Sequence, residues 1–317
     1  MAHEVQSMAH VNATPWHGLG NKLTPHQPIE VWRREAGMDW SIEETPVLYS
    51  VSPNGLHLKS DPDVKVLFRS DNQAPLSVVS KRYQVVQPHD VLEFYRDLVS
   101  VGGFELETAG VLKGGKKLWA LAKTGQQTLL KGGDHVKGYL LLATSCDGSL
   151  CTTAQFTSVR MVCNNTLQMA VGENSGAVKV PHSTKLDMSQ VKEALGIRIS
   201  AWDRFTASIK QLAERKIHKF EAMNYLVNVL GDPELPIAEQ PNQKALQLVQ
   251  DLYAGGGKGS DLVSASGTGW GLVNAVTEYV DQHRRARSQD YRLDSAWFGQ
   301  GAAIEEKAYL EAMKLAA

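Results

Sequence analysis

The clearest pattern of hydrophobic and polar positions lies near the middle of the chain. Residues 138–145 form an uncharged apolar run, typical of a strand covered on both faces, and residues 150–163 are rich in β-branched and aromatic side chains. Between them, Asp147-Gly148 indicates a two-residue hairpin turn, because both residues tolerate a positive φ. Residues 164–166, Asn-Asn-Thr, can then cap a helix that starts at Leu167. The centre of the chain is therefore predicted to be a hairpin that leads into a helix.

The residues before this hairpin are predicted to add further hairpins and short helices. Alternation of apolar and polar residues predicts strands, and apolar residues three and four positions apart predict helices. We expect strands over residues 40–49, 64–69, 76–80, 104–112 and 116–123, and helices over residues 28–38 and 91–101. Sequential antiparallel strands with helices to one side form an α+β domain.

The pattern changes after residue 172. Residues 173–186 are polar and contain Pro181, as in a linker, and the remainder has helical periodicity. We expect helices over residues 189–214, 220–230, 243–253, 269–287 and 304–315. The predicted fold class is α+β: an antiparallel sheet of β-hairpins with helices on one side and a β-β-β-α core over residues 1–182, then an all-helical part over residues 183–317.

The composition is that of a globular protein and predicts no particular partner. The chain has 317 residues, 43% hydrophobic and 21% charged, and its net charge of −1 provides no global field for nucleic acid or membranes. Its three cysteines, Cys146, Cys151 and Cys163, have neither zinc-site nor disulfide spacing. The sequence has no signal peptide and no apolar run long enough to cross a membrane. We therefore expect free thiols, no metal, no cofactor and a cytoplasmic location.

The sequence motifs do not assemble a catalytic site. The glycine cluster at residues 255–260 lacks the glycine of a Walker loop six residues before Lys258 and the hydroxyl residue after it, so a flexible interhelical loop is favoured. Cys163 precedes two asparagines, but papain-like proteases place their catalytic residues far apart, which favours a buried structural thiol. We expect a protein that is not an enzyme, although missing motifs do not exclude an unrecognised site.

Basic residues gather in and beside the predicted hairpins. Such lysines can simply protect the edge of a sheet, and that interpretation is as well supported as a functional one. In the functional interpretation they line a groove for a phosphate backbone, and Tyr83 stacks on a base. The candidate nucleic-acid contacts are Arg69, Lys81, Arg82, Tyr83, Lys116, Lys117, Lys137 and Arg160.

Arg160 is the only charge in residues 150–163, and Val162 shares its face of the predicted strand. Its guanidinium must therefore find a partner or reach solvent. One possibility is a structural pair with an acid such as Asp147 or Glu107. The favoured possibility is a phosphate contact beside the helix expected near Asn165, whose N-terminus would also attract anions.

Three strings in the chain resemble a family of uncharacterised proteins carried by phages, prophages and plasmids. They are the opening MAHEVQSMAHVNATPWHGLG, the central DGS with TSVRMVCNNTLQMA, and the late GTGWGLVNAVTEYVDQHRRAR. The resemblance spans nearly the whole chain and implies a mobile element in a bacterial host, but no established activity. The family usually has His directly after the residue that matches Asp281, whereas this chain has Gln282 there.

The predicted strand order is also similar to the β-β-β-α core of single-strand annealing proteins, which form rings that hold single-stranded DNA in a basic groove. This similarity is an analogy of fold. It implies a DNA-metabolism protein that binds single-stranded DNA as a homo-oligomer and anneals strands in recombination. The alternative is an interaction protein that binds a host factor, in an anti-defence or regulatory role, through its helical half and without nucleic acid.

Overall fold

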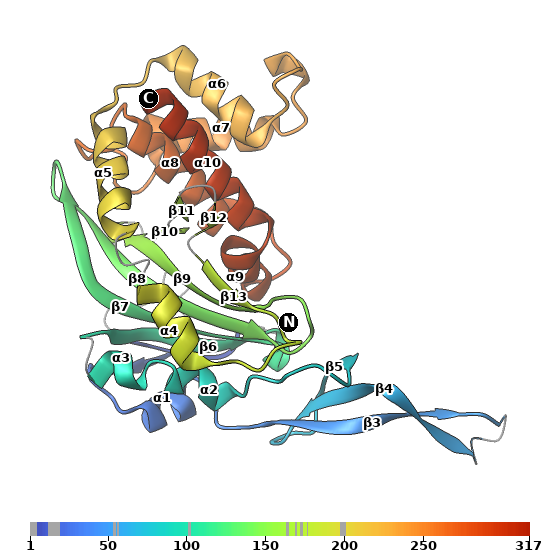
Figure 1. Cartoon of the computed structure of the whole chain (residues 1–317). Coiled ribbons are helices and arrows are strands. Elements are labelled where there is room, and N and C mark those ends of the chain that lie inside the picture. The colour runs from blue at the N-terminus through green and yellow to red at the C-terminus, as the bar shows by residue number, and fades with distance from the viewer. Residues whose placement is uncertain are drawn as a thin grey trace. The chain divides into compact units, whose positions relative to one another are not determined.

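The computed structural model describes residues 5–11, 20–52, 55, 57–100, 103–162, 165–168, 170–171, 174–175, 177–196 and 201–317. The chain forms two compact units, and each is made of several chain segments. Figure 1 shows the helices and strands of the whole chain, coloured by residue number. The first unit contains Met1–Thr124, Leu140–Gln155 and Ala177–Gly196, and the second contains Gly125–Tyr139, Phe156–Gly176 and Ile197–Ala317. The boundary expected near residue 182 divides the chain once, whereas residue 182 lies inside the Ala177–Gly196 segment of the first unit.

The main sheet is mixed, and its central strands pass through both units. Its described strands follow the order β10-β9-β8-β7-β6-β1-β2, and β13 also pairs with β9. The pairs of β6 with β7 and of β1 with β6 are antiparallel, whereas β1 and β2 are parallel. The strands are β1 (Val5–Val11), β2 (Asn21–Leu23), β6 (Glu105–Leu112), β7 (Lys117–Leu130), β8 (Asp134–Ser145), β9 (Thr152–Arg160), β10 (Asn165–Gln168) and β13 (Ala177–Val180). The short strands β11 (Ala170–Val171) and β12 (Asn174–Ser175) pair with each other.

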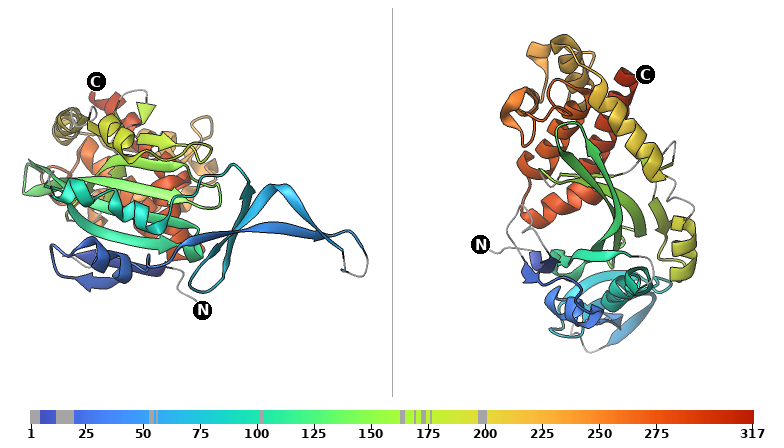
Figure 2. Two further views of the ribbon diagram at one scale, coloured as in Figure 1. Left: turned by 60° about the horizontal axis from the view of Figure 1, so that its bottom comes forward. Right: turned by 90° about the vertical axis from the view of Figure 1, so that its left-hand side faces the viewer.

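The first unit carries its own antiparallel sheet of three strands. These are β3 (Ile42–Ser50), β4 (Leu58–Arg69) and β5 (Pro75–Ser80), in the order β3-β4-β5. Side chains near the base, such as Ile42 and Leu67, are buried, whereas the far end of the β3–β4 pair is exposed. That pair extends away from the helices of the same unit as a two-stranded arm (Figure 2).

Short helices pack on the strands of the first unit. They are α1 (Ile29–Glu35), α2 (Pro88–Glu93), α3 (Arg96–Ser100) and α4 (Met188–Gly196). Trp32 of α1 and Leu92 of α2 are buried, as expected for apolar positions that recur at helical spacing. The hydroxyl of buried Tyr95 lies 2.9 Å from the carbonyl oxygen of Ala120 and 3.0 Å from that of Leu140, which fixes this segment against β7 and β8.

The second unit is built around one buried helix. Every residue of α8 (Gly269–Glu278) is buried, which is the pattern of a helix surrounded by other elements. Around it lie α5 (Ala201–Glu214), α6 (Lys219–Leu230), α7 (Gln243–Asp251), α9 (Gln289–Phe298) and α10 (Gln300–Ala316). Each of α7 and α8 continues into a π-helical turn, Leu252–Gly256 and Tyr279–His283 respectively. No helix in the described part of the chain combines the length and apolarity needed to cross a membrane.

Three predictions for the centre of the chain were wrong. The helix expected from Leu167 is strand β10, which pairs antiparallel with β9 so that Asn165 lies opposite Arg160. Part of the expected linker is strand β13, which pairs with the other end of β9. The tight Asp-Gly turn is a longer connection, because β8 ends at Ser145 and β9 begins at Thr152. Local capping and turn preferences were overridden by pairing with β9.

Candidate nucleic-acid interface

Three loop segments with an excess of cations meet in the first unit. Tyr83, just after β5, donates a hydrogen bond from its hydroxyl to the carbonyl oxygen of Ser145 at 2.8 Å. The N–H of Cys146 donates to the carbonyl oxygen of Lys116 at 2.9 Å. The end of β5, the β6–β7 turn and the end of β8 are therefore joined. Four cations on these segments are exposed or half-buried, and we call them the basic rim: Lys81, Arg82, Lys113 and Lys116.

Lys81 and Arg82 are the most accessible members of the basic rim. Both are exposed, and neither side chain has a hydrogen-bond or ion-pair partner among the residues that the structure describes. The turn that presents them is fixed by its backbone, since the N–H of Lys81 donates to the carbonyl oxygen of Asp63 at 2.8 Å. Free cations on a fixed turn can neutralise phosphates with little loss of backbone entropy.

Two further predicted contacts, Arg69 at the end of β4 and Lys117 at the start of β7, are buried. Arg69 is 4% exposed, and its guanidinium forms two hydrogen bonds to Asp71, from Nε at 2.9 Å and Nη2 at 2.6 Å. It also lies over the Trp40 ring, 4.1 Å from the centroid. The hydrogen bonds from Arg69 lower the pKa of Asp71. Lys117 is similarly buried, at 5% exposed, so neither cation is presented to a ligand in this conformation.

Tyr83 already has a stacking partner. Its ring lies 4.4 Å from the ring of His182 at an interplanar angle of 14°, and burial raises the pKa of its hydroxyl well above the ordinary value. The nitrogens of His182 lie 3.0 Å and 3.1 Å from the carbonyl oxygens of Gln84 and Leu150, so its ring is held in place. One face of the Tyr83 ring is therefore covered by His182 and is not available to a base.

The remaining two predicted contacts lie in the second unit. Lys137 is half-buried on β8, and Arg160, at the end of β9, has a side chain only 2% exposed. The acid that pairs with Arg160 is Asp134, whose oxygens lie 2.9 Å from both Nε and Nη2 of the guanidinium, and not Asp147 or Glu107. Residues 165–168 form strand β10, so the helix whose N-terminus was expected to attract an anion near Asn165 does not form there.

Asp134 is the centre of this polar cluster and was not among the predicted site residues. The same carboxylate accepts hydrogen bonds from Ser264 Oγ at 2.7 Å and Trp270 Nε1 at 3.2 Å. Arg160 in turn donates from Nη2 to the carbonyl oxygen of Gly259 at 2.9 Å. Asp134 has no distinctive sequence context beyond following two glycines, so nothing local indicated its partners.

The glycine-rich loop after α7 contacts the carboxylate of Glu278. The N–H of Lys258 donates to Glu278 Oε2 at 2.9 Å, and a Cβ at Gly257 would lie 3.1 Å from the same oxygen. The loop therefore connects two helices, as the sequence indicated, and its amide is occupied by a carboxylate. On α10, Glu305 is 2% exposed and its Oε1 has no hydrogen-bond partner in the described part of the chain, while burial and the charge of Asp281 raise its pKa.

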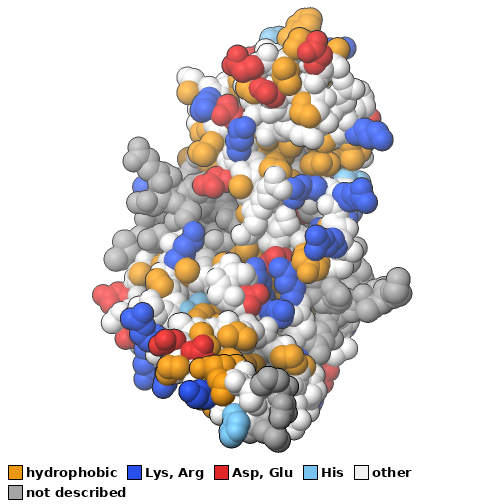
Figure 3. Space-filling view, turned by 90° about the vertical axis from the view of Figure 1, so that its right-hand side faces the viewer, with side chains coloured by type: hydrophobic (Ala, Val, Ile, Leu, Met, Phe, Trp, Pro, Cys, Tyr) orange, Lys and Arg blue, Asp and Glu red, His pale blue; other side chains and the backbone are white. Residues whose placement is uncertain are grey.

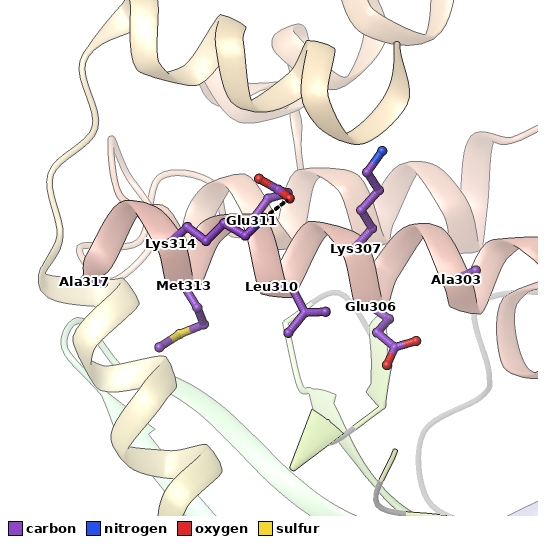
Figure 4. A pocket seen from close by; sticks show the side chains of 8 residues that line it. All are labelled: Ala303, Glu306, Lys307, Leu310, Glu311, Met313, Lys314 and Ala317. Atoms are coloured by element: carbon purple, nitrogen blue, oxygen red, sulfur yellow. Dashed lines mark hydrogen bonds and ion pairs between the residues drawn. The ribbon is translucent and has the colours of Figure 1, made fainter. Parts of the chain in front are cut away.

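A shallow hollow follows one face of α10 (Figure 4). Leu310 and Met313 point to one side of the helix, and Lys314 forms an ion pair with Glu311 at 2.6 Å. Leu310 is 46% exposed. The hollow is apolar in its middle and charged at its rims, which suits a protein contact better than a phosphate backbone.

Among the described residues, no cluster of His, Cys, Asp and Glu has the geometry of a metal site.

The chain belongs to the family described as Domain of unknown function (DUF932), which matches residues 75–297. The match includes the basic rim, the Asp134–Arg160 pair and α8. The comparisons with curated proteins and with solved structures found no match.

Proposed function

We propose that this member of the DUF932 family is a DNA-metabolism protein of a phage or plasmid, and that it binds single-stranded DNA through the basic rim. The observation that carries the proposal is that two cationic segments, the end of β5 and the β6–β7 turn, are joined through the end of β8, while the side chains of Lys81 and Arg82 have no partner among the described residues. Over these segments and the adjoining Arg69–Asp71 turn, the cations are Arg69, Lys81, Arg82, Lys113, Lys116 and Lys117, and the carboxylates are Asp71 and Asp147. A local excess of cations can attract a phosphate backbone although the chain as a whole is nearly neutral.

The proposal includes action as a homo-oligomer in the annealing of strands, by analogy with the ring-forming single-strand annealing proteins. The buried residues Arg69, Lys117 and Arg160 are assigned to the scaffold. Lys137 is retained as a weaker candidate contact because it is half-buried in the other unit.

The test is the affinity for a labelled single-stranded oligonucleotide as a function of salt. We expect the logarithm of the binding constant to fall linearly with the logarithm of the salt concentration, with a slope of about −0.7 per phosphate neutralised. The double variant Lys81→Gln, Arg82→Gln should bind more weakly and have a slope less steep by about 1.4. The matched control is Arg204→Gln, Lys210→Gln, which removes two exposed cations from α5. No binding by the wild type at low salt, or equal losses in both variants, would contradict the proposal.

A second candidate function is an interaction protein that binds a host factor through the second unit. It is favoured by Phe220, which is 83% exposed in the first turn of α6, and by Ile237, which is 56% exposed after that helix. Exposed aromatic side chains are typical of protein contacts. A pull-down that recovers one stoichiometric host protein with the wild type and loses it with Phe220→Ser would favour this function, provided that no nucleic acid is bound.

A further inference from the structure

The arm of the first unit exposes large apolar side chains on both of its faces. Leu48 lies opposite Ser60, and Tyr49 lies opposite Lys59, on the two paired strands β3 and β4. Leu48 and Leu58 share one face and are 56% and 59% exposed. Tyr49 and Val51 share the other face and are 48% and 51% exposed. Hydrophobic side chains gather over this end of the first unit in Figure 3. An isolated two-stranded ribbon is only marginally stable in water, so this arm has the composition of a segment that pairs with something else.

The free edge of β3 is suited to strand pairing. The N–H of Val51 donates to the carbonyl oxygen of His57 at 3.0 Å, so Val51 and Tyr49 direct their backbone groups toward β4. Leu48 and Ser50 therefore direct theirs outward. At the base of β3 the edge is already used, because Ile42 exchanges hydrogen bonds of 2.8 Å and 3.1 Å with the side-chain amide of Gln87. The free edge is confined to the far half of the strand.

The opposite edge of the arm is protected. On β4, the outward-facing residues Leu58 and Ser60 are followed directly by Asp61-Pro62-Asp63. The register with β3 shifts at this point, and the N–H of Asp63 is occupied by the side chain of Asp61 at 3.0 Å. Charge, proline and an irregular register are the usual means of blocking an edge strand. Pairing is therefore expected at β3.

The charge of the arm selects its partner. From Pro46 to Ser60, the only Lys, Arg, Asp or Glu residue is Lys59, and the flanking charges Glu44, Asp61 and Asp63 are acidic. Acidic flanks disfavour a phosphate backbone. A second copy of the same uncharged edge is complementary, because an antiparallel pair of identical strands places no like charges opposite each other within this segment.

We propose that β3 pairs antiparallel with β3 of a second copy of this chain, with Tyr49 on the twofold axis. In this register the outward-facing Leu48 of each copy pairs with Ser50 of the other, so their backbone groups can exchange hydrogen bonds. Tyr49 then faces Tyr49, and Val47 faces Val51, so every large apolar residue of that face meets another. A shift of two residues in one direction would place Val47 opposite Tyr49 and Thr45 opposite Val51. A shift of two residues in the other direction would move Val47 beyond the paired segment.

The inference deepens the homo-oligomer part of the proposed function and does not depend on DNA binding, so it is tested without nucleic acid. The mass of the full chain in solution is measured by light scattering over a range of concentrations. We expect the wild type to approach twice the chain mass of 34.8 kDa. Ser50→Pro removes an outward N–H from the β3 edge and should give the monomer mass. Ser60→Pro removes the corresponding N–H from the β4 edge and should leave the dimer intact.

A cross-link tests the register. Tyr49→Cys, in a Cys151→Ser background that lacks one exposed native thiol, should form a disulfide between two copies under mild oxidation. Directly opposite residues of an antiparallel pair that do not exchange hydrogen bonds have Cα atoms about 4.5 Å apart, within reach of a disulfide. The Cys151→Ser background alone should form none of this product.

Three results would overturn the inference: a monomeric wild type, a dimer that persists in Ser50→Pro, or a Tyr49→Cys variant that does not cross-link. If the wild type is monomeric and its β3 amides become protected from hydrogen exchange only when oligonucleotide is added, the arm binds nucleic acid instead. An intact dimer that binds no DNA would refute the proposed function and leave this inference standing.

Discussion

Arg160 and Asp134 form a buried ion pair, with Nε and Nη2 of the guanidinium each 2.9 Å from the carboxylate oxygens and side chains 2% and 0% exposed. The pair joins the end of β9 to the start of β8. Through Ser264 and Trp270 it also holds the segment that leads into α8. Sheet and helices of the second unit are therefore connected by one carboxylate.

Removing either member of this pair should strongly destabilise the protein. Asp134→Asn leaves a buried guanidinium without its counter-charge, and Arg160→Met leaves the carboxylate unpaired, so each is expected to lower the free energy of unfolding by about 3 to 5 kcal/mol. Urea denaturation measures this loss. Arg160→Lys should also lower stability, because a lysine cannot reproduce the planar fork, and DNA affinity should be unchanged. If the Arg160→Lys variant were as stable as the wild type but bound DNA more weakly, that result would support a phosphate contact of Arg160, which was the interpretation favoured by the sequence.

The Glu305→Gln variant should become more stable than the wild type as the pH rises. Burial, and then the charge of Asp281, raise the pKa of the Glu305 carboxyl in the folded chain. The folded state therefore holds this proton more tightly than the unfolded state, and the resulting stability is lost as the pH rises from the unfolded-state pKa through the folded one. The amide does not ionise, so the variant should not show this loss. Urea titrations between pH 4 and 8 should show a widening difference in favour of Glu305→Gln, while the exposed neighbour Glu306→Gln should show none.

Tyr83→Phe should separate a structural role from base stacking. The variant loses the 2.8 Å hydrogen bond to Ser145 and keeps an aromatic ring against His182, so we expect about 1 kcal/mol of destabilisation with little change in DNA affinity. Tyr83→Leu also loses the ring stack and should be less stable still. The sequence-based contact would be supported if Tyr83→Leu, compared at a temperature where it remains folded, bound the oligonucleotide much more weakly than Tyr83→Phe.

The two described cysteines should differ sharply in reactivity. Cys151 is exposed, whereas burial, followed by the charge of Asp147, raises the pKa of Cys146 to about 12. Because the thiolate is the reactive form, a thiol reagent at pH 8 should modify Cys151 in the folded protein and Cys146 only after denaturation. Cys151→Ser should remove one rapidly reacting equivalent, and Cys146→Ser should remove none. Rapid modification of Cys146 would indicate that the β8–β9 connection opens.

The sequence predicted elements whose local pattern and tertiary environment agree. The helix expected over residues 220–230 is α6, and the strands expected over residues 76–80 and 104–112 are β5 and β6. The pattern failed where strand pairing decided the structure, as at Asn165, whose capping preference was overridden by its pairing with Arg160 on the preceding strand. Helix α9 was not predicted.

Only part of the candidate site could be predicted from the sequence, for a related reason. Sequence alone identified Lys81 and Arg82 as cations on a turn, and both are exposed. It could not separate them from Arg69 or Arg160, because burial and ion pairing are set by residues distant in sequence; Asp134, for example, lies 26 positions before Arg160. The backbone hydrogen bond that joins Lys116 to Cys146 likewise has no sequence signature.

The strands β7, β8 and β9 each begin in one compact unit and end in the other. No single cut in the polypeptide can therefore release either unit whole, since a fragment that ends at residue 182 lacks α4 of the first unit and carries only the strand segments of the second. Genetic exchange that shuffles contiguous gene segments would break both units at any junction between β7 and α4. The two units must be inherited together, as one indivisible module.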